Sequence, residues 1–224
     1  MESGFESVLN PQKHWQNFKK SWMNGMRNME IYFVRHGETE WNKEGRLQGW
    51  LDSKLTARGI AQAERLRNEL PNFQATYSSP LQRAIQTASI LADQEIHLDD
   101  RLKEIHLGIW QGQLIEALLK DELYDAYCNR PAMYVPNGGE TFEQVTHRMW
   151  DFLMDCSKLH QGERILVVTH GVAIRALLLK VLNLPIRKIW DFGEIDGTSV
   201  TKIVIENGRF IVESIGMTEH ITLL

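Results

Sequence analysis

The chain has 224 residues, and 43% of them are hydrophobic, which fits one domain with a sizeable core, alone or with a short extension. The formal net charge of −4 gives no general electrostatic case for nucleic acid, so any positive site must be local. The two cysteines, Cys128 and Cys156, fall in no metal-binding spacing and indicate a reducing compartment without a disulfide framework.

Residues 1–28 contain no apolar run long enough for a secretory signal or a membrane span. We interpret them as an N-terminal extension, helical or disordered, and assign residues 29–224 to the folded domain. The alternative is a short amphipathic helix that docks on the domain or on a partner. The sequence predicts a cytoplasmic protein that binds neither membrane nor nucleic acid.

The first predicted strand covers residues 31–34, a run of four apolar side chains. Arg35 and His36 follow at once, and Gly37 then lets the chain turn sharply. Ligands bind at the carboxyl ends of strands in open α/β sheets, so this strand predicts a site at its end.

Residues 41–50 follow as a long polar, glycine-rich loop, of a kind that is often functional. Thr56 is a predicted cap for a helix that runs to about Leu70, because Pro71 comes next.

A second strand–turn–helix unit begins with a short predicted strand at residues 75–78. Ser79 fits the N-cap of the next helix, Pro80 its first position, and Arg83 its first turn. The free N–H groups and partial positive charge of a helix N-terminus favour anions.

The middle of the chain predicts a short strand at 96–98, an irregular loop over 102–113, and a helix from about 113 to 127. Prolines and glycines then interrupt the pattern, and Thr141 caps a predicted long helix.

The pattern of an apolar strand followed by His and Gly recurs at residues 164–169. His170 and Gly171 follow this strand directly, and a helix then runs to about residue 182. Two strand-like runs at the end of the chain meet at Asn207-Gly208, which predicts a hairpin. This order of elements predicts an α/β fold, a three-layer α/β/α sandwich with a mixed, mainly parallel sheet.

Two histidines and two arginines at predicted strand ends make phosphate the expected ligand. Neutral imidazole can attack phosphorus, which suits His36 or His170. Arg35 and Arg83 would bind phosphate oxygens in a bidentate way. Asn42 either donates one more hydrogen bond to the ligand or caps a turn of its own loop.

Hydrolysis also needs an acid that protonates the leaving oxygen, and Glu104, Glu38 and Glu140 are all candidates. Spacing alone does not choose among the three. The sequence has no metal-binding motif, and positive side chains can replace a metal in holding a phosphoryl group, so we expect neither metal nor cofactor.

Five motifs in order resemble those of the histidine phosphatase superfamily, which includes the cofactor-dependent phosphoglycerate mutases. The resemblance covers about residues 29–215. The motifs are Arg35-His36-Gly37-Glu38-Thr39 with Trp41-Asn42, Arg46-Leu47-Gln48-Gly49-Trp50 with Leu55-Thr56 and Gly59, Ser78-Ser79-Pro80-Leu81 with Arg83, Glu104-Ile105 with Leu107-Gly108, Trp110 and Gly112, and Thr169-His170-Gly171.

This resemblance implies a phosphoglycerate mutase-like fold without a metal. It implies that His36 is the nucleophile and becomes phosphohistidine, and that Glu104 is the proton donor. The phosphoryl group is then bound by Arg35, Arg83 and His170, and the substrate pocket also includes Asn42, Gln48 and Gly171.

Phosphatase and mutase are the competing interpretations within the family. Residues 105–112 are similar to the phosphatase branch and its broad-specificity bacterial members. Val172 stands where mutases have Asn, and no long insert with paired arginines separates Gly112 from Gly138. These features favour the phosphatase. A non-catalytic phosphate-recognition module is the remaining alternative, which the retention of the histidines and the acid disfavours.

The expected substrate is a small phosphorylated metabolite, with inorganic phosphate as product and a monomer or homodimer as the assembly. Sugar phosphates and the nucleotide-loop phosphate of a corrinoid precursor stay open. Residues 113–136 either form an aromatic lid over the site or pack as ordinary helices. The aromatic and apolar residues concerned are Trp50, Trp110, Tyr124, Tyr127, Met133 and Tyr134.

Overall fold

A computed structural model describes residues 28–219 of the chain. The predicted N-terminal extension lies outside the described residues, except for Asn28. Within the described range, no helix combines the length and the apolar character that a membrane crossing requires.

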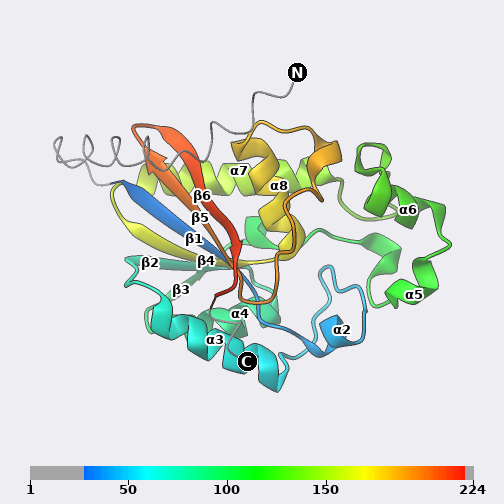
Figure 1. Cartoon of the computed structure of the whole chain (residues 1–224), viewed down its shortest axis with the longest axis horizontal. Helices are drawn as coiled ribbons and strands as arrows, with labels where there is room; N and C mark the ends of the chain where they lie inside the picture. The colour runs from blue at the N-terminus through cyan, green and yellow to red at the C-terminus, as the bar shows by residue number, and fades with distance from the viewer. Residues whose placement is uncertain (1–27, 220–224) are drawn as a thin grey trace.

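The centre of the fold is a six-stranded sheet in the order β3-β2-β4-β1-β5-β6 (Figure 1). The pairs β1–β4, β4–β2 and β2–β3 are parallel, whereas β5 and β6 form an antiparallel hairpin against β1. The strands are β1 (Met29–Arg35), β2 (Ala75–Ser78), β3 (Ile96–Leu98), β4 (Arg164–Thr169), β5 (Val200–Glu206) and β6 (Arg209–Met217). The predicted hairpin at Asn207-Gly208 is confirmed, and both residues have positive φ.

Helices cover both faces of the sheet, with α3 and α4 on one side and α7 and α8 on the other (Figure 1). The helices are α2 (Glu40–Lys43), α3 (Ala57–Glu69), α4 (Gln82–Leu91), α5 (Ile115–Leu118), α6 (Glu122–Asn129), α7 (Phe142–Leu159) and α8 (Gly171–Val181). Separate apolar cores fill the two spaces between the layers. The predicted α/β sandwich with a mixed, mainly parallel sheet is therefore confirmed.

The strand register brings the two histidines together. Arg35 pairs with Thr169 across the parallel strands β1 and β4, so the next residues, His36 and His170, leave the sheet side by side. The neighbouring strand β2 ends at Ser78, opposite Val168 of β4, and leads to Arg83 at the start of α4. The topology thus gathers three separate parts of the chain at one edge of the sheet.

The predicted helix from about 113 to 127 is wrong, because the segment forms two helices, α5 and α6. The Asp121 side chain accepts hydrogen bonds from the backbone N–H groups of Leu123 and Tyr124. This internal N-cap starts a new helix where a continuous one was expected.

The predicted N-cap at Ser79 is also wrong. Helix α4 begins at Gln82, after Leu81 in extended conformation. The carboxylate of Asp52, from a distant loop, accepts the hydrogen bond from the Gln82 N–H, so a tertiary contact replaces the local cap.

The aromatic residues of the expected lid mostly belong to the core. Trp110, Tyr124, Tyr127 and Tyr134 are buried and stack on one another and on Phe142. Met133 is exposed, and Trp50 instead packs its ring edge-on against His106. Packing is therefore the main role of this cluster, and Tyr127 alone among the six reaches the cleft described below.

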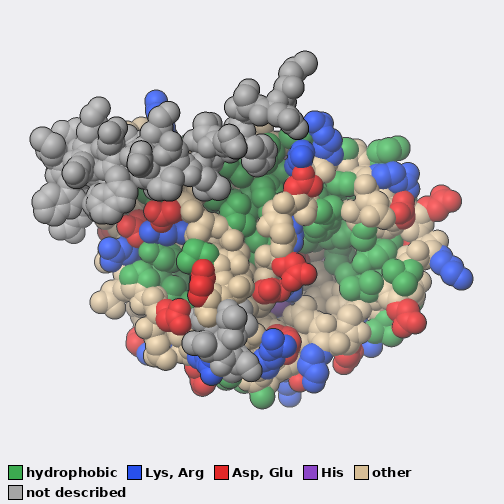
Figure 2. All heavy atoms as spheres, in the orientation of Figure 1, with side chains coloured by type: hydrophobic (Ala, Val, Ile, Leu, Met, Phe, Trp, Pro, Cys, Tyr) green, Lys and Arg blue, Asp and Glu red, His purple; other side chains and the backbone are tan. Residues whose placement is uncertain are grey.

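The outer surface is mixed in character (Figure 2). On the face shown, acidic and basic side chains are interspersed, and hydrophobic side chains gather over α5 and α6. Exposed apolar residues of this region are Leu114, Leu119, Leu123 and Met133.

Candidate active site

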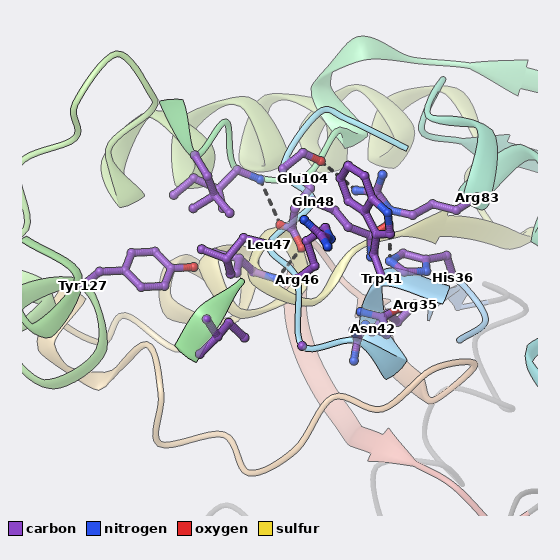
Figure 3. Close-up of a pocket in the computed structure, with 16 residues that line it drawn as sticks. Arg35, His36, Trp41, Asn42, Arg46, Leu47, Gln48, Arg83, Glu104 and Tyr127 are labelled. Carbon is purple, nitrogen blue, oxygen red and sulfur yellow. Dashed lines mark hydrogen bonds between the residues drawn. The ribbon is translucent and has the colours of Figure 1, made fainter. Parts of the chain in front are cut away.

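A cleft of about 170 Å³ opens at the carboxyl ends of β1 and β4, large enough for a small molecule rather than a single water. Arg35, His36 and Arg83 lie together at one side, and the Tyr127 ring enters from the opposite side (Figure 3). The residues that line it are Arg35, His36, Trp41, Asn42, Gly45, Arg46, Leu47, Gln48, Gly49, Arg83, Glu104, Ile105, Leu107, Ile115, Tyr127 and Val172.

The hydrogen bonds of His36 define its tautomer. Its Nδ1 lies 2.8 Å from the carbonyl oxygen of Gly37, which can only accept, so Nδ1 carries the proton. Its Nε2 lies 3.2 Å from Nε of Arg83, which can only donate, so Nε2 keeps its lone pair. The nitrogen that faces the cationic side of the cleft is therefore the one without a proton.

Burial, and then the positive charges of Arg83 and Arg35, hold the pKa of His36 well below its usual range. Burial and Arg83 also depress the pKa of His170 strongly. Both imidazoles are accordingly neutral at neutral pH, which a nucleophile on nitrogen requires.

His170 lies behind His36, with 5.1 Å between the ring centroids, and is fully buried. Its Nε2 is 2.8 Å from the hydroxyl of Ser79. Its Nδ1 and the Nε of Arg35 are buried without a hydrogen-bond partner in the described part of the chain. Two unpaired polar atoms beside a nucleophile are what an anionic ligand would satisfy.

Both arginines are held in place by protein groups. Nη1 of Arg35 donates to the carbonyl of Ile195 at 2.6 Å. Arg83 is 1% exposed, and it donates to the carbonyls of Leu51 and Gly49 and to the carboxylate of Asp52. Two oriented guanidinium groups therefore flank the nucleophile without an ordering cost at the time of reaction.

Among the three carboxylates that sequence reasoning left open, only Glu104 faces the cleft. Its oxygens accept hydrogen bonds from the N–H groups of Val172 and Ala173 at the start of α8. Glu38 instead accepts from the Thr56 hydroxyl, and Glu140 is paired with Arg148. The geometry thus supports Glu104 as the acid.

The remaining predicted residues differ in position. Asn42 and Gln48 line the cleft, but the Asn42 amide oxygen also accepts from the Thr39 N–H and hydroxyl, so both interpretations of Asn42 have support. His170 and Gly171 are not part of the cleft lining; Gly171 lies beside the Arg35 side chain, where an added Cβ would stand 3.6 Å from Nε.

Sequence reasoning missed Asp52 and the role of Ser79. Asp52 joins Nη1 of Arg83 at 2.8 Å and caps the backbone of α4, whereas Ser79 holds the ring of His170. Both act on residues about 30 or more positions away in the chain, so no local spacing could reveal them. The only available signals were that both residues are polar, that Ser79 is part of a recognised motif, and that Asp52 lies between two motif segments.

Within residues 28–219, no group of three or more His, Cys, Asp or Glu side chains is arranged to hold a metal ion. The charges at this site come from guanidinium groups and a helix N-terminus. These groups can take the role that metals play in other phosphoryl-transfer sites.

The model of the histidine phosphatase superfamily (branch 1) matches residues 31–218. The fold, the paired histidines and this match show that the chain belongs to the histidine phosphatase superfamily, as the motifs predicted.

Its relatives include phosphoserine phosphatases and proteins named as phosphoglycerate mutases or phosphoglycerate mutase-like. Phosphoserine phosphatase 1 of Hydrogenobacter thermophilus is 34% identical over 200 residues, which span 86% of this chain and 94% of that protein. The metal-independent phosphoserine phosphatase of Arabidopsis thaliana is 35% identical over 204 residues, 86% of this chain and 83% of that protein. Among solved structures, a mutant phosphoserine phosphatase of Entamoeba histolytica in complex with phosphoserine has a TM-score of 0.80 and 31% identity, over 86% of this chain and 98% of that one.

Proposed function

We propose that this chain is a metal-independent phosphomonoesterase that hydrolyses small phosphorylated metabolites through a phosphohistidine on His36. The observation that carries the proposal is the state of His36: a neutral imidazole whose Nε2 lone pair lies beside Arg83, in a cleft that also contains Glu104. A non-catalytic phosphate-binding module would have no need of the acid.

In the first step, Nε2 of His36 attacks phosphorus while the bond from phosphorus to the ester oxygen breaks. Glu104 gives its proton to that oxygen, and the alcohol leaves. Arg35, Arg83 and His170 stabilise the charge on the phosphoryl oxygens. The imidazole becomes positive as it is phosphorylated, and the Gly37 carbonyl, 2.8 Å from Nδ1, stabilises that charge.

In the second step, water attacks phosphorus and gives a proton to the Glu104 carboxylate. The phosphorus–nitrogen bond breaks, and its electron pair returns to Nε2 of His36. Inorganic phosphate leaves, and both residues regain their starting states. Glu104 thus acts as an acid and then as a base, as microscopic reversibility requires.

The apolar part of the cleft lining suits a small organic leaving group. Leu47, Ile105, Ile115 and Val172 contribute to it, and Tyr127 adds a ring with a hydroxyl. Burial, and then the charge of Glu104, raise the pKa of Tyr127 well above its usual range, so this hydroxyl stays protonated and can donate. Phosphoserine is the first candidate substrate, because the relatives are named for it.

We also propose a cytoplasmic location and a monomeric or homodimeric state. Cysteine chemistry supports the location, because Cys128 and Cys156 are both free. Residues 29–224 would form the catalytic domain.

A panel of phosphomonoesters, ranked by kcat/KM with and without EDTA, tests the proposed function. It should include phosphoserine, p-nitrophenyl phosphate, a sugar phosphate and 3-phosphoglycerate. We expect EDTA-insensitive release of phosphate and, after rapid denaturation with labelled substrate, an acid-labile phosphoenzyme. Activity that EDTA abolishes, or isomerisation of 3-phosphoglycerate primed by bisphosphoglycerate in place of hydrolysis, would overturn the proposal.

A further inference from the structure

Arg148, on helix α7, does not line the cleft, and all five of its guanidinium N–H groups donate hydrogen bonds to other parts of the protein. Nη1 donates to the backbone carbonyls of Arg101 at 2.7 Å and Lys103 at 2.6 Å. Nη2 donates to the carbonyl of Glu104 at 2.9 Å. Its remaining two bonds, from Nε and Nη2, go to the two carboxylate oxygens of Glu140 at 2.9 and 3.0 Å.

Glu140 contacts the same segment from its other end. One carboxylate oxygen accepts a hydrogen bond from the His106 N–H at 2.9 Å, and the Glu140 N–H donates to the His106 carbonyl at 2.8 Å. The preceding Gly139 passes so close that an added Cβ would lie 2.2 Å from that carbonyl oxygen. The backbone on both sides of Glu104 is therefore fixed by one ion pair.

We propose that Glu140 and Arg148 are positioning residues for the proton donor Glu104. This inference rests on the proposed function and goes beyond it, because neither residue touches the reacting atoms. Glu140 was a candidate acid on sequence grounds; the structure gives it a different task.

The physical basis is that the Glu104 carboxyl must meet two requirements at once. It accepts hydrogen bonds at 3.2–3.3 Å from the N–H groups of Val172 and Ala173, and its proton must reach the ester oxygen. Misplacing a catalytic group by about 1 Å can cost about 10²-fold in rate. Five donors in one rigid plane hold three carbonyls and a carboxylate together, which no other side chain can do.

Positioning and general stability make different predictions. An alkyl ester needs protonation of its leaving oxygen, whereas p-nitrophenolate leaves with little help. A misplaced Glu104 should therefore slow an alkyl phosphate more than p-nitrophenyl phosphate. A variant that only reduces the folded fraction should slow both equally.

The variants are Arg148→Lys, which keeps the charge but loses the planar donors, and Glu140→Gln, which keeps an acceptor for the His106 N–H. Arg67→Lys is the matched control, because Nη2 of Arg67 contacts both carboxylate oxygens of the exposed Asp93 and neither residue lines the cleft. Thermal unfolding verifies that each variant is folded at the assay temperature.

We expect kcat for an alkyl phosphate such as phosphoserine to fall about 10- to 100-fold in both Arg148→Lys and Glu140→Gln, and kcat for p-nitrophenyl phosphate to fall less than about threefold. Vanadate affinity should be unchanged, because the phosphoryl-binding groups stay in place. Arg67→Lys should match the parent chain on both substrates.

Equal losses on both substrates, or no loss in folded variants, would overturn the positioning role while leaving the phosphatase intact. A parent chain that hydrolyses neither ester would overturn the proposed function itself, and the positioning role with it. If Arg148→Lys does not fold, Glu140→Gln decides the question alone.

Discussion

Two histidine environments in this fold have opposite character. His160, just before β4, has both ring nitrogens engaged: Nε2 with the Tyr77 hydroxyl at 2.8 Å and Nδ1 with the Glu163 carboxylate at 2.7 Å. His36, just after β1, has an arginine on Nε2, and its neighbour His170 has an unpaired Nδ1. One histidine has a negative partner, and the others have positive neighbours.

This contrast separates a structural imidazole from a reactive one. A carboxylate on Nδ1 and a hydroxyl on Nε2 hold the His160 ring between two protein groups. Guanidinium groups around His36 do the reverse, because they disfavour its protonated form and leave Nε2 as the base. The sign of the neighbouring charge therefore distinguishes the two environments.

The sharpest test of the contrast substitutes one histidine from each environment. His36→Ala should lower kcat on p-nitrophenyl phosphate by about 10⁴-fold or more, because the nucleophile is lost. His160→Ala should leave kcat within about twofold but lower the melting temperature, because Tyr77 and Glu163 lose their partner. Comparable activity of the two variants would remove the distinction.

A smaller effect is expected from the guanidinium beside the nucleophile. Arg83→Lys keeps the charge, but a lysine cannot donate hydrogen bonds to His36, Gly49 and Asp52 together in this geometry. We expect kcat/KM to fall about 10²- to 10³-fold, the size of a lost oxyanion donor. Arg130→Lys is the control and should not change kcat/KM, because Nε and Nη2 of Arg130 donate only to the exposed Asp125 carboxylate. An active Arg83→Lys would mean that charge alone suffices.

The smallest effect concerns stability against pH. The folded chain holds the pKa of His36 and His170 well below the value near 6.5 expected in the unfolded chain. The unfolded state therefore binds more protons once the pH falls below about 6.5, and the free energy of unfolding should decrease there with falling pH. Above that value this contribution is complete.

Urea unfolding between about pH 5 and pH 8 measures this slope. His36→Asn should flatten it, whereas His160→Gln should not reproduce that change. A slope below pH 6.5 that is unaffected by His36→Asn would show that other groups cause the pH dependence.

The parts of this fold that sequence could predict are those with local causes. The apolar strand before Arg35-His36 and the Asn207-Gly208 turn have signals within a few residues, and both are confirmed. Convergence of His36 and His170 was predictable because parallel strands of one sheet end at the same edge.

Features with causes far along the chain were not predictable. The start of α4 depends on Asp52, and the acid segment depends on Arg148. The aromatic residues of 110–134 had a composition that fits a lid or a core, and only the packing distinguishes the two.

The bond from Arg83 Nε occupies the lone pair of His36 that has to attack. An electrophile reaches that nitrogen only by displacing the guanidinium N–H, which then lacks an acceptor unless the newcomer carries anionic oxygen. A phosphoryl group brings such oxygens, whereas a neutral alkylating or acylating reagent brings none. In the resting state the Arg83 hydrogen bond thus protects the imidazole from neutral reagents, whereas a phosphoryl group can displace that bond and reach Nε2.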